Sequence, residues 1–115
     1  MTVRIYHNPR CSKSRQTLGL LQENGVEPEI VLYLETPPDA ATIRAIVGKL
    51  GLASARDLMR RGEAVYKELG LKDVTDEDAL IQAMADNPIL IERPIVLNGA
   101  KARIGRPPEG VLEIV

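Results

Sequence analysis

Residues 7–15, read as HNPRCSKSR, contain the only cysteine of the 115-residue chain, Cys11. Cations lie on both sides of this thiol, at Arg10, Lys13 and Arg15, with no acidic residue among them. The segment falls between a predicted strand and a predicted helix, where free backbone N–H groups and the helix dipole stabilise an anion. Because the thiolate is the nucleophilic form of cysteine, the sequence predicts a reactive thiol. The alternative is an inert cysteine that packs as a small hydrophobe.

Three neighbours of Cys11 are candidates for supporting its negative charge. Ser14 occupies the position of the second cysteine in a C-x-x-C motif, so its hydroxyl could donate to the thiolate but cannot form a disulfide. Arg15 adds positive charge, and His7 could help as an imidazolium, although a lone histidine at a strand end is more often structural. A single thiol predicts that the reductant comes from outside the chain. We expect the pKa of Cys11 to lie below the value of about 8.5 typical of a free cysteine.

Two arginines precede prolines late in the chain, as Arg93-Pro94 and Arg106-Pro107. The planar guanidinium makes paired, charge-assisted hydrogen bonds that suit a tetrahedral oxyanion, although most single arginines are surface ion-pair partners. A cis peptide bond is accessible at X-Pro, and at Pro94 it would turn the backbone toward the thiol loop. The sequence therefore offers a thiolate and two distant arginines that a fold could bring together.

Composition limits the class of protein. The length suits one domain, and 44% hydrophobic with 27% charged residues is typical of globular chains. A net charge of -1 argues against a general nucleic-acid or anionic-membrane surface, and no apolar run reaches the roughly 18 residues of a membrane span. A single cysteine excludes an internal disulfide framework and a Cys-rich zinc site, and no secretory signal is visible. We therefore expect a cytoplasmic protein.

The elements that must position these residues can be predicted from periodicity. Residues 3–7 alternate as a strand, residues 14–24 form a helix that ends before Gly25, and residues 29–34 are a continuous apolar run. Such a run is typical of a strand covered on both faces. These three elements predict a βαβ unit with parallel strands and a right-handed crossover.

The remainder of the chain changes character twice. Residues 39–87 are predicted to be largely helical, as an insertion within the domain. Candidate helix starts within it are Asp39, Ser54 with Asp57, and Thr75 with Asp78. The pair Asn98-Gly99 then joins two short apolar runs, which predicts an antiparallel hairpin with both residues at the turn, followed by a short terminal helix.

Five segments together carry a family resemblance: YHNPRCSKSR, LMRRGE, YKELGL, NPILIERPIV and ARIGRPPE. In this order, and over essentially all 115 residues, they resemble the glutaredoxin-linked arsenate reductases of the thioredoxin-like superfamily, in particular their short housekeeping branch. The resemblance implies one thioredoxin-like α/β domain over residues 1–115, in the order βαβ, helical insertion at about 39–87, ββα. It also implies a four-stranded mixed sheet.

The resemblance further assigns roles to individual residues. It implies that Cys11 is the nucleophile, assisted by His7, and that Pro94 is the cis-proline of the family. The three arginines that bind the oxyanion in the family fall on Arg60, Arg93 and Arg106. Every one of these positions carries the residue type that the family requires.

The chemistry implied is the reduction of arsenate, or of a similar small oxyanion, by an enzyme without a metal or prosthetic group. Cys11 attacks arsenic, glutathione acts as co-substrate, and glutaredoxin is the partner that regenerates the thiol while arsenite is released. The resistance enzymes of the family carry a small residue where this chain has Arg10, and Gly-Thr-Ser where it has residues 12–14, Ser-Lys-Ser. These differences leave the physiological substrate and the turnover open.

Two alternative functions stay open, and one is rejected. The first is a monothiol oxidoreductase that acts on glutathione conjugates or another substrate. The second is a non-enzymatic transcription regulator of the Spx type, several of which sense oxidation through a C-x-x-C motif that Ser14 interrupts here. A phosphatase loop of the form C-x5-R is rejected, because the required arginine position holds Thr17.

Overall fold

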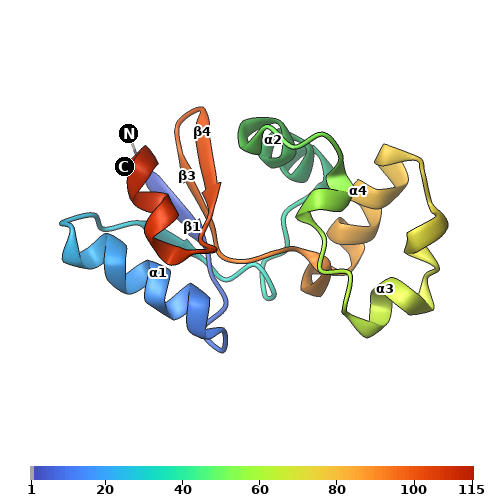
Figure 1. The fold of residues 1–115 in the computed structure, drawn as a ribbon, viewed down its shortest axis with the longest axis horizontal. Helices are drawn as coiled ribbons and strands as arrows, with labels where there is room; N and C mark the ends of the chain where they lie inside the picture. The colour runs from blue at the N-terminus through green and yellow to red at the C-terminus, as the bar shows by residue number, and fades with distance from the viewer. Residues whose placement is uncertain (1) are drawn as a thin grey trace. The chain divides into compact units, whose positions relative to one another are not determined.

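The computed structural model describes residues 2–115, which form two compact units (Figure 1). The sheet unit consists of residues 2–36 and 93–115, and the helical unit consists of residues 37–92. The helical segment predicted at about 39–87 lies inside the helical unit. No helix within residues 2–115 is long and apolar enough to cross a membrane.

The sheet unit contains four strands in the order β2-β1-β3-β4, which confirms the predicted mixed sheet. The strands are β1 (Val3–Tyr6), β2 (Glu29–Val31), β3 (Ile95–Asn98) and β4 (Lys101–Ile104). Strands β1 and β2 are parallel and are joined by α1 (Ser12–Glu23), whereas β3 is antiparallel to both β1 and β4. The terminal element is the 3-10 helix η4 (Pro108–Ile114), drawn in red in Figure 1, which packs against α1 and β4.

The core of the sheet unit joins residues from β1, α1, β3 and η4. Its fully buried members are Ile5, Leu21, Val96 and Val111. Burial of these apolar side chains in one cluster holds α1 and η4 against the sheet. The loop that follows β1 and carries Cys11 therefore starts from a rigid strand and ends in a packed helix.

Two local predictions in the sheet unit are wrong. Strand β2 ends at Val31 and is an edge strand whose Ile30 is 46% exposed, so it is not covered on both faces. The hairpin turn is Gly99-Ala100, because Asn98 still pairs with Lys101 in the ladder. Among the described residues, positive φ is confined to glycines, and only Gly99 adopts it in this turn, at 62°.

The helical unit contains six short helical elements. They are α2 (Ala40–Leu50), η1 (Ala55–Leu58), α3 (Ala64–Glu68), η2 (Leu71–Asp73), α4 (Glu77–Asp86) and η3 (Pro88–Leu90). Apolar side chains from α2, η1, α4 and η3 are buried, among them Ile43, Leu58, Leu80 and Leu90. An isolated antiparallel bridge joins Met59, which follows η1, to Ile91, which follows η3.

The helix starts of this unit show which capping predictions were correct. Asp39 caps α2 as predicted, accepting a hydrogen bond of 2.8 Å from the Thr42 N–H. Ser54 caps η1 by accepting from the Arg56 N–H. The prediction of Thr75 as a cap is wrong, because Asp76 caps α4 by accepting from the Asp78 N–H.

Candidate active site

Cys11 lies at the N-cap position of α1, whose first residue, Ser12, comes two residues before the helix start predicted from the sequence. Its N–H donates to the Asn8 carbonyl at 3.0 Å, and its carbonyl accepts from the Arg15 N–H at 3.0 Å. The loop that follows β1 therefore turns sharply and presents the half-buried thiol at the amino end of the helix. At that position, the first N–H groups of the helix have no intrahelical acceptor and can donate to an anion.

The sulfur of Cys11 is surrounded by hydrogen-bond donors. Burial raises the pKa of Cys11, whereas hydrogen bonding with the backbone N–H groups of Ser14 and Lys13 and with the Arg93 side chain lowers it. With the charge of Arg93 added, the pKa of Cys11 is lowered below its ordinary value. Arg106 Nη2 also lies 3.5 Å from Cys11 Sγ. The two arginines that precede prolines thus meet at the thiol.

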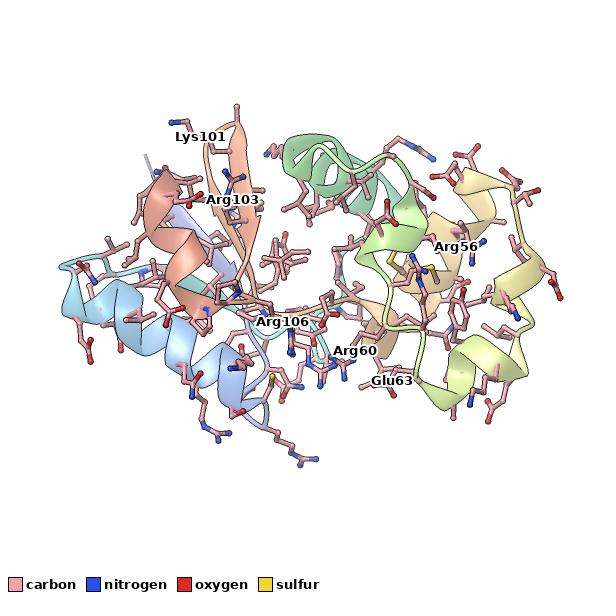
Figure 2. All side chains as sticks on the ribbon, in the orientation of Figure 1. Arg56, Arg60, Glu63, Lys101, Arg103 and Arg106 are labelled. Carbon is pink, nitrogen blue, oxygen red and sulfur yellow. The ribbon has the colours of Figure 1, made fainter. Side chains whose placement is uncertain are left out.

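Arg106, labelled in Figure 2, is held in place by the neighbouring arginine. Its Nε donates to the Arg93 carbonyl at 2.9 Å. This bond fixes the orientation of the guanidinium, whose Nη2 lies against the Cys11 sulfur. The peptide bond before Pro94 is cis, the state that the family resemblance implies, and the bond before Pro107 is cis as well. Sequence reasoning missed the second cis bond.

His7 and Ser14 contact each other in the loop that carries the thiol. His7 Nδ1 lies 2.6 Å from Ser14 Oγ, and this oxygen also accepts from the Asn8 N–H at 3.0 Å. The pKa of Cys11 is lowered by the Ser14 backbone N–H, and donation by the Ser14 hydroxyl stays a prediction. Burial, together with the charge of Arg15, lowers the pKa of His7 and so disfavours the imidazolium form.

Arg15 is exposed, and its guanidinium Nη1 donates to the Pro9 carbonyl at 2.9 Å. It therefore stabilises the shape of the loop, and its charge acts on His7. Arg93 and the Lys13 N–H lower the pKa of Cys11, and a contribution from the positive charge of Arg15 stays a prediction. Sequence reasoning missed Lys13 and Asn8 as backbone participants. The donors could have been found by placing the helix start at Cys11, because the second and third N–H groups of a helix face its cap residue.

Arg60 belongs to the helical unit, where it follows η1. Its Nε donates to Glu63 Oε1 at 3.1 Å and its Nη1 donates to Glu92 Oε1 at 3.0 Å (Figure 2 labels Arg60 and Glu63). Partial burial disfavours its charge, but the two carboxylates raise the pKa of Arg60. Neither acid was singled out in the sequence. Convergence of Arg60 with Arg93 and Arg106 on one oxyanion stays a prediction.

Within residues 2–115, no three His, Cys, Asp or Glu side chains gather in an arrangement that could hold a metal ion. The Cys11 sulfur, its N–H donors and the guanidinium groups are the reactive and charged groups that this site brings together. Such a set can stabilise a thiolate and an incoming oxyanion at once.

Comparison with known proteins agrees with this geometry. The model of the ArsC family matches residues 6–114. The chain belongs to the ArsC family. The uncharacterized protein YfgD of Escherichia coli (strain K12) is 70% identical to it over 98% of this chain and 96% of its own length. A protein of Neisseria meningitidis serogroup A named arsenate reductase is 56% identical, covering 95% of this chain and 94% of its own.

Solved structures confirm that this ArsC-family chain has the thioredoxin-like α/β fold. The arsenate reductase from Vibrio cholerae superposes with a TM-score of 0.97 at 52% identity, covering 100% of this chain and 98% of its own. At that level of identity, the arrangement of strands and helices is shared along the whole chain. Fold alone does not establish the reaction, which depends on the residues around Cys11.

Proposed function

We propose that this protein is an arsenate reductase of the monothiol type, with Cys11 as its nucleophile. The observation that carries the proposal is the position of the Cys11 sulfur, 3.5 Å from Arg106 Nη2 and hydrogen-bonded to the side chain of Arg93. A thiolate beside two guanidinium groups is equipped to attack an oxyanion and to compensate its charge. The names of the relatives at 43% to 56% identity support arsenate as the substrate.

In the proposed reaction, the Cys11 thiolate attacks the arsenic atom of arsenate, and one oxygen leaves as water after taking up protons. The new bond joins sulfur to As(V). A glutathione thiolate then attacks the Cys11 sulfur, so that a sulfur–sulfur bond forms and the sulfur–arsenic bond breaks. The electron pair of the broken bond stays on arsenic, which leaves as As(III) in arsenite, while Cys11 and glutathione form a mixed disulfide.

Regeneration needs an external thiol, because the chain has a single cysteine. We propose glutaredoxin as the partner that reduces the mixed disulfide and restores the Cys11 thiol, with glutathione as the co-substrate. Neither a metal nor a prosthetic group takes part in this scheme. The cytoplasm, where glutathione is kept reduced, is the compartment that suits it.

A second candidate is a monothiol oxidoreductase that acts on glutathione conjugates or another substrate. It is favoured by Arg10, an exposed cation directly before the nucleophile. An anionic substrate larger than arsenate could contact that side chain. This candidate uses the same thiol and the same regeneration, but it does not require oxyanion binding by Arg93 and Arg106.

A coupled assay distinguishes the two. Arsenate, glutathione and glutaredoxin are mixed with the protein, and oxidation of NADPH by a glutathione-reducing system is followed. We expect arsenate-dependent turnover that is abolished by Cys11→Ser and lowered about 10²-fold by Arg106→Ala. Arg103→Ala is the matched control, because Arg103 pairs with Glu113 on the exposed side of β4. Turnover that does not depend on arsenate, or that is equal in the Arg106 and Arg103 variants, would contradict the proposal.

A further inference from the structure

Gly105 occupies a position at the end of β4 where no side chain fits. A Cβ placed on it would lie 2.5 Å from Thr17 Oγ1 and 2.7 Å from Pro94 Cγ. Carbon atoms in good packing are separated by about 3.5 to 4.0 Å, so both contacts are strongly repulsive. The φ of Gly105 lies outside the left-handed region, so the requirement is for space and not for backbone freedom. Gly19 and Gly110 differ, because a Cβ there would meet nothing within 4 Å.

Thr17 connects Gly105 to the part of α1 that holds the thiol. Its side chain is completely buried, and its Oγ1 donates to the Lys13 carbonyl at 2.8 Å. The N–H groups of Lys13 and of its neighbour Ser14 donate to the Cys11 sulfur. A displacement of Thr17 would therefore move the turn of helix that supplies these donors.

The segment around Gly105 also fixes the two arginines. The Gly105 N–H donates to the Pro94 carbonyl at 2.9 Å, and the Arg106 Nε donates to the Arg93 carbonyl at 2.9 Å. A further bond from the Arg106 N–H to the Ile104 carbonyl, at 2.9 Å, turns the chain at Gly105. These hydrogen bonds hold the two proline-containing segments together, and the two segments carry both guanidinium groups.

We propose that Gly105 is a positioning residue for the thiol site. Its missing side chain allows the first turns of α1 to lie directly against the segment that carries Arg93 and Arg106, so that the guanidinium groups reach the Cys11 sulfur. A methyl group at this position would push the first turns of α1 away from the segment that carries Arg93 and Arg106. Hydrogen bonds weaken steeply as their geometry departs from the optimum, so a small separation lowers the stabilisation of the thiolate.

This inference concerns the thiol that the proposed function uses, but its test needs neither arsenate nor glutathione. The rate of alkylation of Cys11 by iodoacetamide, measured against pH, gives the pKa of the thiol. We expect Gly105→Ala to raise this pKa by about half a unit or more and to lower the alkylation rate at pH 7 about threefold. Gly19→Ala, on the same helix as Thr17, and Gly110→Ala, in η4, are matched controls that should leave the pKa unchanged. Failure of the arsenate assay would leave this result untouched.

A second substitution tests whether the close contact is the cause. Thr17→Ala removes both Oγ1 and Cγ2, the atoms at 2.5 and 3.1 Å from the added Cβ. We expect the double variant Gly105→Ala with Thr17→Ala to recover part of the lost thiol acidity relative to Gly105→Ala, with Thr17→Ala alone as its reference. Circular dichroism establishes that each variant is folded.

Each remaining outcome overturns the proposal. A folded Gly105→Ala protein with the wild-type pKa would show that the spacing does not control the thiol. A raised pKa that Thr17→Ala does not relieve would place the cause outside this contact. A Gly105→Ala protein that does not fold, with or without Thr17→Ala, would make Gly105 a requirement of the fold alone.

Discussion

The Cys11 sulfur lies where two opposing effects act on its charge. Partial burial disfavours the thiolate, whereas the N–H groups of Ser14 and Lys13 and the guanidinium of Arg93 favour it, and the second set prevails. The donors come from a helix terminus and from a distant strand end, so their combined effect depends on the folded state. Unfolding therefore returns the thiol to the ordinary acidity of a free cysteine.

His7 should make the stability of the protein depend on pH. Burial, together with Arg15, lowers its pKa in the folded state below the ordinary value of 6.5. Between these two values the unfolded chain binds a proton that the folded chain does not bind, so the free energy of unfolding falls as the pH is lowered from about 6.5. His7→Asn, which keeps a polar atom near Ser14 Oγ, should lose this dependence.

Urea denaturation of both proteins between about pH 5.5 and pH 7.5 measures the effect. The chain contains no other histidine, so the difference between the two pH profiles belongs to His7. Well above pH 6.5 the ring becomes neutral in both states, and the two profiles should run parallel. Equal slopes over the whole interval would contradict the lowered pKa.

At the scale of single residues, the sequence indicated which side chains could be reactive or charged, but it indicated much less about their hydrogen-bond partners. Cys11 could be singled out because a lone thiol between cations is unusual in sequence. The roles of His7 and Ser14 could not be predicted, because a hydrogen bond of 2.6 Å between them depends on how the loop turns at Asn8. The hydrogen bond from the Arg15 guanidinium to the Pro9 carbonyl could not be predicted for the same reason.

At the scale of the elements, α2 offers a test of how its end is specified. Gly51 follows the helix with a φ of 68°, in the left-handed region, whereas Gly48 lies inside the helix. Neither position has an atom within 4 Å of an added Cβ, so only backbone conformation differs. Gly51→Ala should therefore destabilise the protein by about 1 to 2 kcal/mol. Gly48→Ala should stabilise it by about 0.5 to 1 kcal/mol.

Chemical denaturation of the two variants against wild type gives both values. The two substitutions add the same methyl group to the same helix, so any general effect of alanine cancels between them. If the free energy of unfolding changed with the same sign in both variants, the left-handed cap would not determine where α2 ends. The expected result is a change of opposite sign at the two positions.

Element types were more predictable than their ends and exposure. The βαβ unit, the hairpin and the cap at Asp39 follow from periodicity and from side chains that act on their own backbone. The exposure of β2 could not be predicted, because an apolar run does not reveal whether its strand lies at the edge of a sheet. The α4 start was misplaced by one residue, since Thr75 and Asp76 are both good caps and only the local geometry selects Asp76.

At the scale of the whole molecule, the predicted oxyanion-binding residues belong to different units. Cys11, Arg93 and Arg106 lie in the sheet unit, whereas Arg60 lies in the helical unit, and its role in oxyanion binding stays a prediction. Arg60 could be identified only through the family resemblance, because nothing in its local sequence distinguishes it from the adjacent Arg61. The structure does distinguish them: Arg60 is partly buried between Glu63 and Glu92, whereas Arg61 is exposed.

This difference makes Arg60 and Arg61 a matched pair for testing oxyanion binding. We expect Arg60→Ala to lower kcat/KM for arsenate about 10²-fold, the loss typical of removing one donor that stabilises developing charge. Arg60→Lys should recover only part of this, because an ammonium group lacks the planar pair of donors. Arg61→Ala removes a single exposed ion pair with Asp57 at 3.2 Å and should leave kcat/KM nearly unchanged. If Arg60→Ala and Arg61→Ala retained equal activity in folded protein, oxyanion recognition would have to be assigned to the sheet unit alone.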